Sequence, residues 1–268
     1  MSYKVLLWDS LTSIEWSQAP WRKEGRRIGL DDCDQELIHD VLLRYLPRDG
    51  VIVDAGCGVG KWPIYLRRHG YRVLGVDISH EACAIGREND PGLGVAQADV
   101  RYTPLKTASV DAVVSLGVVE HDEHGPDAAL REARRILKPT GILVLAVPYN
   151  NWWRKLVANR LMDYVTRKRI RATMRLGFNE YRFDKRELRA ALHRAGFEPQ
   201  RAYPNDLKPP KNMGLWVDWN NLVFHPLLSK PDQELFVFPG LKGRLANALS
   251  RWLPWFACGE VVFIARAR

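Results

Sequence analysis

Cysteine is scarce in this sequence, and its four residues are far apart. They stand at positions 33, 57, 83 and 258, so none forms the Cys-x-x-Cys pair of a metal or redox centre. Free thiols in a reducing compartment are the plain interpretation. No run of about 18 apolar residues occurs, so we expect no membrane-spanning segment. The first residues lack a long apolar stretch and a small-residue cleavage site, so we expect no secretory signal.

What the sequence does have is an ordinary globular composition. Its 268 residues, 46% hydrophobic and 26% charged, suit one large domain or one domain with insertions. A chain of this length buries a core without disulfides or metal ions. Wholesale disorder, a collagen-like repeat and a disulfide framework are therefore excluded. The abundance of Arg, Ala and Leu favours a bacterial source.

The positive charge is concentrated in one segment. The formal net charge is +9, and residues 151–201 hold fourteen Lys or Arg against five Asp or Glu, a difference equal to the whole excess. Such a field attracts phosphate groups, acidic head groups or nucleic acid. The alternative interpretation is a solvated helix face that only aids solubility.

An alternation of strands and helices begins at residue 51, after a predicted helix over 35–45. Short β-branched or apolar runs predict strands that are separated by helical patterns. The expected strands are 51–53, 72–76, 94–98, 110–115 and 142–147, and the expected helices are 61–69, 81–87 and 126–137. Continuous apolar strands that alternate with helices are typical of a parallel sheet covered on both faces, so the predicted class is doubly wound α/β.

The regular alternation ends after Pro148. Residues 151–175 predict a basic helical insertion, and 184–194 predict a helix with Asp184 as its N-cap and Gly196 beyond its end. A strand is expected over 197–203. Irregular sequence then precedes a last strand over 260–265.

A glycine-rich turn follows the first strand of this alternation. Asp54 is followed by Gly56, Gly58 and Gly60, and glycines let a backbone approach a ligand closely. Ligands of such folds bind at the carboxyl ends of the strands. The spacing is neither G-x-G-x-x-G nor a Walker loop, so a nucleoside without phosphates is favoured over a pyrophosphate ligand.

Two further acids end neighbouring strands. Asp77 follows Asp54 by 23 positions, where a carboxylate accepts hydrogen bonds from both ribose hydroxyls. Asp99 ends the third strand, where it would accept from an adenine amine. The alternatives are a helix N-cap or turn residue for Asp77 and a loop carboxylate for Asp99.

At these residues the chain resembles class I S-adenosylmethionine-dependent methyltransferases, and more narrowly the type 11 group that includes ubiquinone and menaquinone C-methyltransferases. The resemblance covers about residues 40–150 and a late helix and strand near 184–203. Its motifs occur in the family's order: 51–60 (VIVDAGCGVG), 75–79 (GVDIS), 98–100 (ADV), 111–121 (DAVVSLGVVEH), 137–148 (LKPTGILVLAVP) and 183–198.

The resemblance implies a Rossmann-like, mostly parallel seven-stranded sheet with an antiparallel last strand, and insertions that form a substrate cap. It also implies S-adenosylmethionine as cofactor and S-adenosylhomocysteine as product. The implied cofactor-binding residues are Gly56 and Gly58 for the methionine part, Gly60 in the same turn, Asp54 for the order of that turn and Asp77 for the ribose. Ile78, Asp99 and Val100 would contact the adenine, and Leu116 and Gly117 would lie close to the sulfonium.

The chain departs from the family where an acceptor would bind. We divide one methyltransferase domain into an N-terminal cap (1–50), a cofactor-binding core (51–148), a basic helical insertion (149–183), the end of the core sheet (184–205 and 260–268) and a second insertion (206–259). Within the second insertion, 240–256 predict either an interfacial helix at a membrane or an amphipathic helix packed on its own core. Trp216 and Trp219 either wall an acceptor pocket or belong to the core.

Catalysis would consist mostly of positioning, since a sulfonium is already a strong electrophile. An O-acceptor would also gain from a general base, and the candidates are His121, His124 and Tyr149. The acids around the two histidines form too loose a pattern for a metal site, so none is predicted.

The predicted function is therefore methyl transfer to a small-molecule or lipid-linked acceptor, by O- or C-methylation, in secondary metabolism or on a cell-envelope glycan. The alternatives are an RNA methyltransferase, disfavoured because no separate RNA-binding module occurs, and a catalytically silent partner subunit that binds S-adenosylmethionine. We expect a cytoplasmic protein with peripheral membrane contact through 240–256 and binding of anionic groups at 151–201. The oligomeric state stays open.

Overall fold

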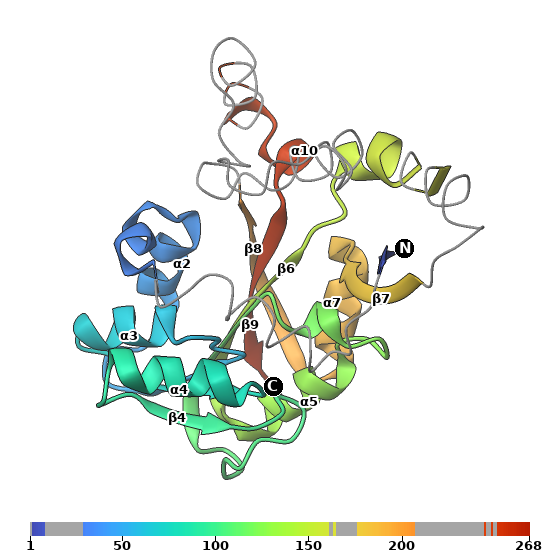
Figure 1. The fold of residues 1–268 in the computed structure, drawn as a ribbon. Coiled ribbons are helices and arrows are strands. Elements are labelled where there is room, and N and C mark those ends of the chain that lie inside the picture. The colour runs from blue at the N-terminus through green and yellow to red at the C-terminus, as the bar shows by residue number, and fades with distance from the viewer. Residues whose placement is uncertain are drawn as a thin grey trace.

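The computed structural model describes residues 2–8, 29–160, 163–164, 176–206, 244, 248 and 251–268. A seven-stranded sheet with the order β4-β3-β2-β5-β6-β9-β8 forms its centre (Figure 1). The strands are β2 (Val51–Ala55), β3 (Arg72–Asp77), β4 (Gly94–Gln97), β5 (Val110–Leu116), β6 (Leu137–Pro148), β8 (Phe197–Asn205) and β9 (Glu260–Ala267). Neighbours from β4 to β6 pair in parallel, and β9 runs antiparallel to both β6 and β8. The predicted α/β class and the antiparallel last strand are confirmed.

Helices cover both faces of this sheet. They are α2 (Leu37–Tyr45), α3 (Lys61–Arg68), α4 (His80–Asn89), α5 (Asp127–Ile136), α7 (Lys185–Arg194) and the short α10 (Pro254–Ala257), with 3₁₀ turns η1 (Leu30–Gln35) and η2 (Val119–His121) and a π turn η3 (Arg154–Ala158). The predicted helices of the core lie within one or two residues of these bounds.

Two clusters of buried side chains join the central sheet to the helices, one on each face of the sheet. Val113 packs with α5 and α7 on one face, whereas its neighbours Ala112 and Val114 pack with α2 and α3 on the other. Alternation with a period of two is what a strand imposes on successive side chains. Because both faces are covered, β5 is apolar at nearly every position rather than at every second one.

Two segments differ from the sequence-based expectation. Residues 138–141, which lie between the expected helix 126–137 and the expected strand 142–147, belong to β6 and mark a shift in its register with β5 between the pairs Val110–Leu137 and Ala112–Ile142. The predicted helical insertion over 149–183 ends in a strand, β7 (Leu176–Arg182), which pairs antiparallel with β1 (Tyr3–Trp8) in a separate small sheet. The N-terminal segment and the insertion are therefore joined by backbone hydrogen bonds.

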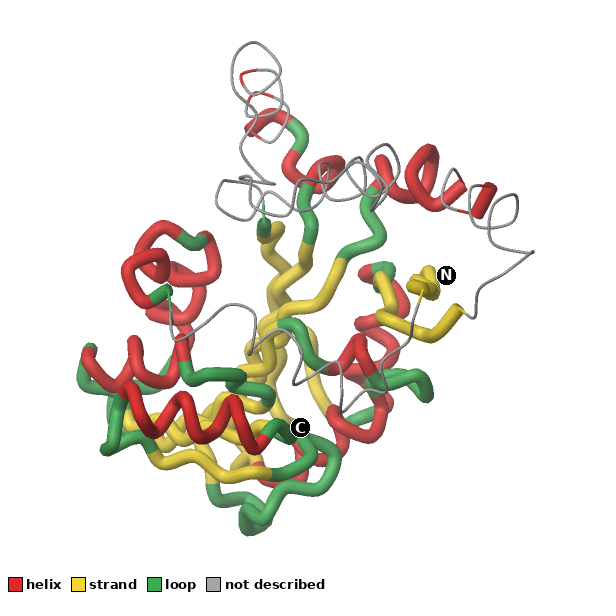
Figure 2. The backbone as a smooth tube through the Cα atoms, in the orientation of Figure 1, coloured by secondary structure: helices red, strands yellow, loops and turns green. Residues whose placement is uncertain are grey.

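The insertions are described only in part. Residues 152–160 form a helix that includes the π turn, and it follows directly on β6, while α10 directly precedes β9. Both lie beyond the same end of the central sheet (Figure 2). Trp216, Trp219 and most of 240–256 lie outside the described residues. No helix within the described ranges is long and apolar enough to cross a membrane.

Candidate functional site

The turn after β2 depends on its glycines. Gly56, Gly58 and Gly60 have φ values of 89°, 54° and 84°, in the left-handed region that side chains disfavour. The N–H groups of Gly56 and Cys57 donate to the carbonyl of Val76 at 2.7 and 3.0 Å, so the turn lies over the end of β3. These conformations explain the alternating glycines seen in the sequence.

Gly56 also permits a close contact between two loops. A Cβ atom at this position would lie 2.3 Å from Cγ2 of Val118, which belongs to the loop after β5. The glycine turn and the loop after β5 therefore meet at the carboxyl ends of β2 and β5. A larger residue at position 56 has no room in this arrangement.

Asp77 connects the glycine turn to the end of β3. Its two carboxylate oxygens accept hydrogen bonds from the N–H groups of Gly58 and Ser79, each at 2.8 Å. Burial raises the pKa of Asp77, although these hydrogen bonds oppose the rise. Each carboxylate oxygen has a second lone pair, so the group retains the capacity to accept from ligand hydroxyls.

Asp54 lies behind the turn in a drier environment. Its side chain is buried, and burial together with the nearby charge of Asp77 raises its pKa to about 7. An acid that far above its ordinary range is a candidate for a functional group, because a folded protein otherwise avoids an unneutralised buried carboxylate.

The remaining predicted cofactor residues lie around the same crevice. Ile78, just after β3, exposes 40% of its surface although it is apolar. Val100, Leu116 and Gly117, at the ends of β4 and β5, are half-buried. The structure thus brings the predicted residues together at the carboxyl ends of β2, β3, β4 and β5.

Asp99 is bound by an arginine, and its predicted role toward adenine stays a prediction. The Arg101 guanidinium donates to both oxygens of Asp99 at 2.6–3.0 Å and to Asp122 at 3.2 Å. Burial alone would raise the pKa of Asp99, but the hydrogen bonds and charge of Arg101 outweigh it and lower the pKa. Arg101 therefore joins the loop after β4 to the loop after β5.

Glu120 is the polar residue that the sequence-based candidates missed. It is 2% exposed, and its Oε2 atom has no hydrogen-bond partner in the structure. Burial raises its pKa well above the usual value, and the charges of Glu180 and Glu260 add to the rise against backbone hydrogen bonds. A carboxyl group in such surroundings is held in its neutral form.

His121 lies beside Glu120 and is suited to accept a proton. Its Nδ1 atom is 2.8 Å from the carbonyl oxygen of Asn179, so Nδ1 donates and Nε2 is the basic nitrogen of the neutral ring. Nε2 lies 4.0 Å from Oε1 of Glu120, and 37% of the histidine side chain is exposed.

The other two candidate bases lie in less suitable surroundings. His124 is exposed, beyond a turn in which its N–H donates to Asp122. Tyr149 is buried with its ring edge-on to Trp255 at a centroid distance of 5.8 Å. Burial raises the pKa of Tyr149 to about 12, with smaller contributions from Cys258 and Asp184, so its phenolate is disfavoured at neutral pH.

Several cations of the basic segment already have protein partners. Arg154 is 3% exposed, and its guanidinium donates to the carbonyls of Tyr149 and Gly259 at 2.7 and 2.9 Å. Lys155 pairs with Asp184. Arg194 donates to both oxygens of Asp127. Only part of the predicted positive field is therefore available to an external anion.

Replacing Arg154 by methionine is expected to lower the free energy of unfolding by about 2–4 kcal/mol, because two buried carbonyls lose their donor. Chemical denaturation measures this difference. Arg160→Met, on the exposed part of the same helix, is the control and should change stability by no more than about 0.5 kcal/mol. Equal effects of the two substitutions would show that Arg154 does not hold the ends of β6 and β9 together.

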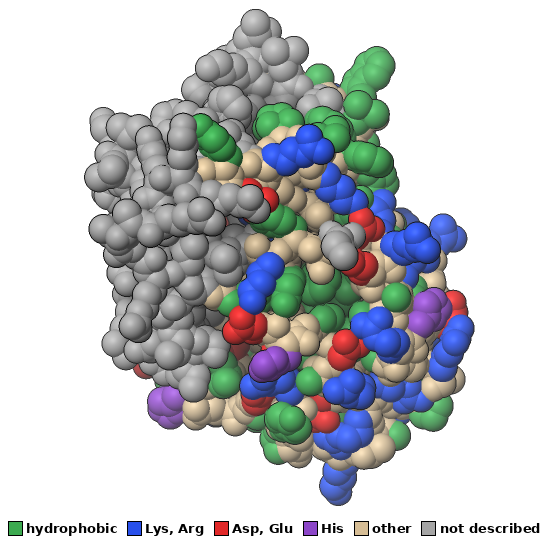
Figure 3. Space-filling view, turned by 90° about the vertical axis from the view of Figure 1, so that its right-hand side faces the viewer, with side chains coloured by type: hydrophobic (Ala, Val, Ile, Leu, Met, Phe, Trp, Pro, Cys, Tyr) green, Lys and Arg blue, Asp and Glu red, His purple; other side chains and the backbone are tan. Residues whose placement is uncertain are grey.

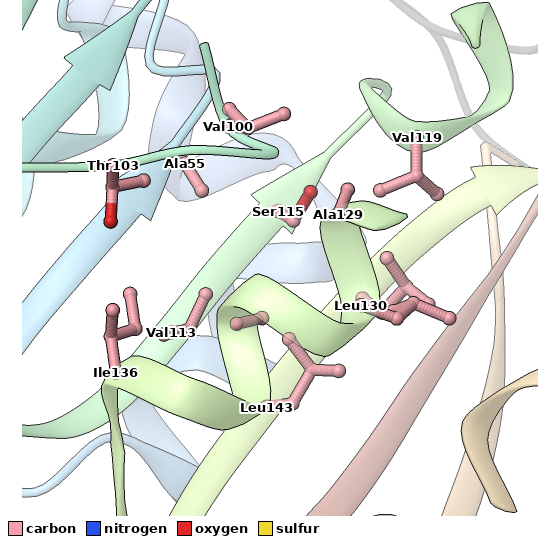
Figure 4. A pocket seen from close by; sticks show the side chains of 12 residues that line it. Ala55, Val100, Thr103, Val113, Ser115, Val119, Ala129, Leu130, Ile136 and Leu143 are labelled. Atoms are coloured by element: carbon pink, nitrogen blue, oxygen red, sulfur yellow. The ribbon is translucent and has the colours of Figure 1, made fainter. Parts of the chain in front are cut away.

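A small apolar cavity lies elsewhere, between α5 and the sheet (Figure 4). Thr103 and Ser115 supply the polar side chains among the residues that line it, and none of the three candidate bases is among them. The cavity is lined mostly by core residues, and it shares Val100 with the crevice. Within the described ranges, no group of three or more His, Cys, Asp or Glu side chains is placed to hold a metal ion.

The comparisons with known proteins agree with this geometry. The family model described as "Methyltransferase domain", of the type 11 group, matches residues 53–145, from the glycine turn to β6. Residues 53–145 are a methyltransferase domain. It is of the S-adenosylmethionine-dependent class, and the predicted family and cofactor class are confirmed.

Relatives with sequence similarity match only part of this chain. A malonyl-[acyl-carrier protein] O-methyltransferase of Pectobacterium atrosepticum is 34% identical over 51% of this chain and 55% of its own length. A Mycobacterium tuberculosis protein named as an S-adenosylmethionine-dependent methyltransferase is 34% identical over 36% of this chain and 35% of its own length. The chain thus spans about a third to a half of the length of these relatives.

The fold extends beyond the methyltransferase domain. A Haloferax volcanii methyltransferase, solved in complex with the activator Trm112, is 21% identical and has a TM-score of 0.61 over 96% of this chain and 99% of its own. At this identity the likeness shows the fold alone, including the sheet strands that follow residue 145.

Proposed function

We propose that this protein transfers a methyl group from S-adenosylmethionine to a small-molecule or lipid-linked acceptor. The observation that carries the proposal is the glycine turn with positive φ at Gly56, Gly58 and Gly60, held by Asp77 at the carboxyl ends of β2 and β3. An arrangement of this kind brings backbone and carboxylate together where ligands of doubly wound folds bind.

The residues around the crevice fit the cofactor. Asp77 would accept hydrogen bonds from the ribose hydroxyls, and the exposed Ile78 offers an apolar surface to the adenine. Leu116 and Gly117 would lie near the sulfonium. When bound, the cofactor supplies a methyl group on a positively charged sulfur. The part of this chain is then to orient the acceptor in line with that methyl and to exclude water.

His121 is the candidate base that this proposal favours. His121 would take the proton of an O–H acceptor at Nε2, with the carbonyl of Asn179 holding the ring through Nδ1. Glu120, neutral and buried, would donate or accept a hydrogen bond at the same end of β5. His124 and Tyr149 are weaker candidates for the base, because one is exposed beyond the turn and the other is buried with a raised pKa.

Some of the described basic residues are not available to RNA. Arg154 is buried, and Lys155 and Arg194 pair with acids, so these three cations contribute little to binding of RNA phosphates, whereas Arg160, Arg186, Arg189 and Arg201 are exposed. The name of the Pectobacterium relative gives an acyl group on a carrier protein as its acceptor. We infer that the acceptor of this protein is similar in size to such an acyl group, and that it is either free or attached to a lipid.

The test is the transfer of radiolabelled methyl groups from S-adenosylmethionine to a fractionated cell extract. We expect label in the organic-solvent fraction or in small soluble metabolites, and less of it with His121→Gln. Label confined to RNA would support the RNA alternative instead. Binding of S-adenosylmethionine without labelling of any fraction would favour a catalytically silent partner subunit.

A further inference from the structure

The helix after β6 has its polar and apolar faces reversed. Arg154, Ala158 and Asn159 are at most 7% exposed and face the sheet, while Trp152 and Leu156 expose 57% and 52% of their surfaces. A helix at the surface of a water-exposed protein ordinarily shows the opposite arrangement. Large exposed apolar side chains on one face mark a surface that another apolar phase covers.

A second segment also exposes apolar side chains. Just before α10, Trp252 is 83% exposed and Leu253 is 55% exposed. The two segments are joined where they leave the sheet, since Asn151 donates to the carbonyl of Cys258 at 2.9 Å and Arg154 donates to that of Gly259. We call Trp152, Leu156, Val157, Trp252 and Leu253 the apolar rim.

Positive charge accompanies the apolar rim. Arg160 and Arg251 are exposed beside it. In the sequence, residues 165–175 contain five Lys or Arg and no acid, and residues 240–256 contain three and no acid. The acids nearest the helix are Asp184, which pairs with Lys155, and the exposed Asp163. Figure 3 shows hydrophobic side chains gathered near the top of the described surface, with Lys and Arg among and below them.

We propose that the apolar rim docks this protein on an anionic lipid bilayer. Tryptophan and leucine beside arginine and lysine are the residues that enter the interface between head groups and acyl chains, and the cations add attraction to acidic lipids. Such docking would place the protein on the bilayer surface without a spanning segment.

The position of the rim connects membrane docking to the proposed methyl transfer. The rim lies beyond the carboxyl end of β6, since Trp152 follows β6 and Leu253 comes just before α10 and the start of the antiparallel β9. Glu120 and His121 follow the carboxyl end of β5, which pairs in parallel with β6. Resting on the proposed methyl transfer, the acceptor is then a lipid-linked molecule that enters from the bilayer. A soluble acceptor would gain nothing from this placement.

The experiment is flotation of the full chain with phosphatidylcholine vesicles that do or do not contain phosphatidylglycerol. The wild-type protein should float with the anionic vesicles and be released by high salt. Trp152→Ser/Leu156→Ser and Trp252→Ser/Leu253→Ser should each weaken binding about ten-fold. Tyr102→Ser is the matched control, since Tyr102 is 76% exposed in the loop after β4.

Two outcomes would overturn the proposal. One is a wild-type protein that does not float with anionic vesicles, and the other is rim variants that float as well as Tyr102→Ser. Oligomerisation that the rim variants abolish, without vesicle binding, would instead assign the rim to a protein partner. Binding of S-adenosylmethionine, measured on the same samples without vesicles, tests the proposed function separately and reports that each variant is folded.

Discussion

Replacing Gly56 by alanine is expected to abolish binding of S-adenosylmethionine and to lower the free energy of unfolding by about 3 kcal/mol or more. The residue has a φ of 89°, and an added Cβ would lie 2.3 Å from Cγ2 of Val118. The glycine turn must therefore move away from the loop after β5, and the crevice loses its shape. Calorimetric titration measures the binding, and chemical denaturation measures the stability.

Two further variants separate the steric clash from the backbone strain. Gly70 has a φ of 84° with no atom within 4 Å of an added Cβ, so Gly70→Ala should lower stability by only about 1–2 kcal/mol and leave binding intact. Val118→Ala removes the two nearest atoms, so it should restore part of the stability lost in Gly56→Ala. If Gly56→Ala binds the cofactor as wild type does, the loops do not depend on this contact.

Replacing Asp54 by asparagine is expected to stabilise the protein at high pH. Burial and the charge of Asp77 raise the pKa of Asp54 from 3.8 to about 7 in the folded state, so the native state binds more protons than the unfolded state between these values. The free energy of unfolding of the wild type therefore falls as pH rises from about 4 to 7, by about 4 kcal/mol at most. Asparagine does not titrate and escapes this loss.

The measurement is the difference in unfolding free energy between Asp54→Asn and wild type across that pH range. The difference should grow in favour of the variant as pH rises and level off above about 7. Asp49→Asn, at an exposed turn, controls for the loss of one negative charge. A difference that stays constant across the range would mean that Asp54 is not held in a dry environment.

The crevice was largely predictable because its signals are local. Each predicted residue lies a few positions from the end of a predicted strand in the sequence, as do Asp54, Asp77 and the glycines from Gly56 to Gly60. The ends of the strands determine where such residues meet. The local spacing did not reveal that Asp99 is bound by Arg101, since a salt bridge depends on side-chain conformation rather than on strand order.

The region around Glu120 and His121, where we expect the acceptor to bind, was less predictable because it is assembled from distant parts of the chain. Strand β1 pairs with β7 across more than 160 residues, and neither strand has a pattern that identifies its partner. Glu120 lies in a run of charged residues that indicates a polar loop. Its burial arises only when β6 and β7 pack against the turn η2 that holds it, and there the charges of Glu180 and Glu260 act on it from β7 and β9.

The central claim is that the glycine turn and Asp77 form a binding site for S-adenosylmethionine, and isothermal titration calorimetry of the wild type and Asp77→Ala tests it most directly. We predict micromolar binding to the wild type and a loss of about 100-fold or more in the variant, because the turn and the ribose both lose their acceptor. Asp40→Ala, on the exposed face of α2, should bind as the wild type does. No binding to the wild type, or equal binding to Asp77→Ala, would contradict the claim.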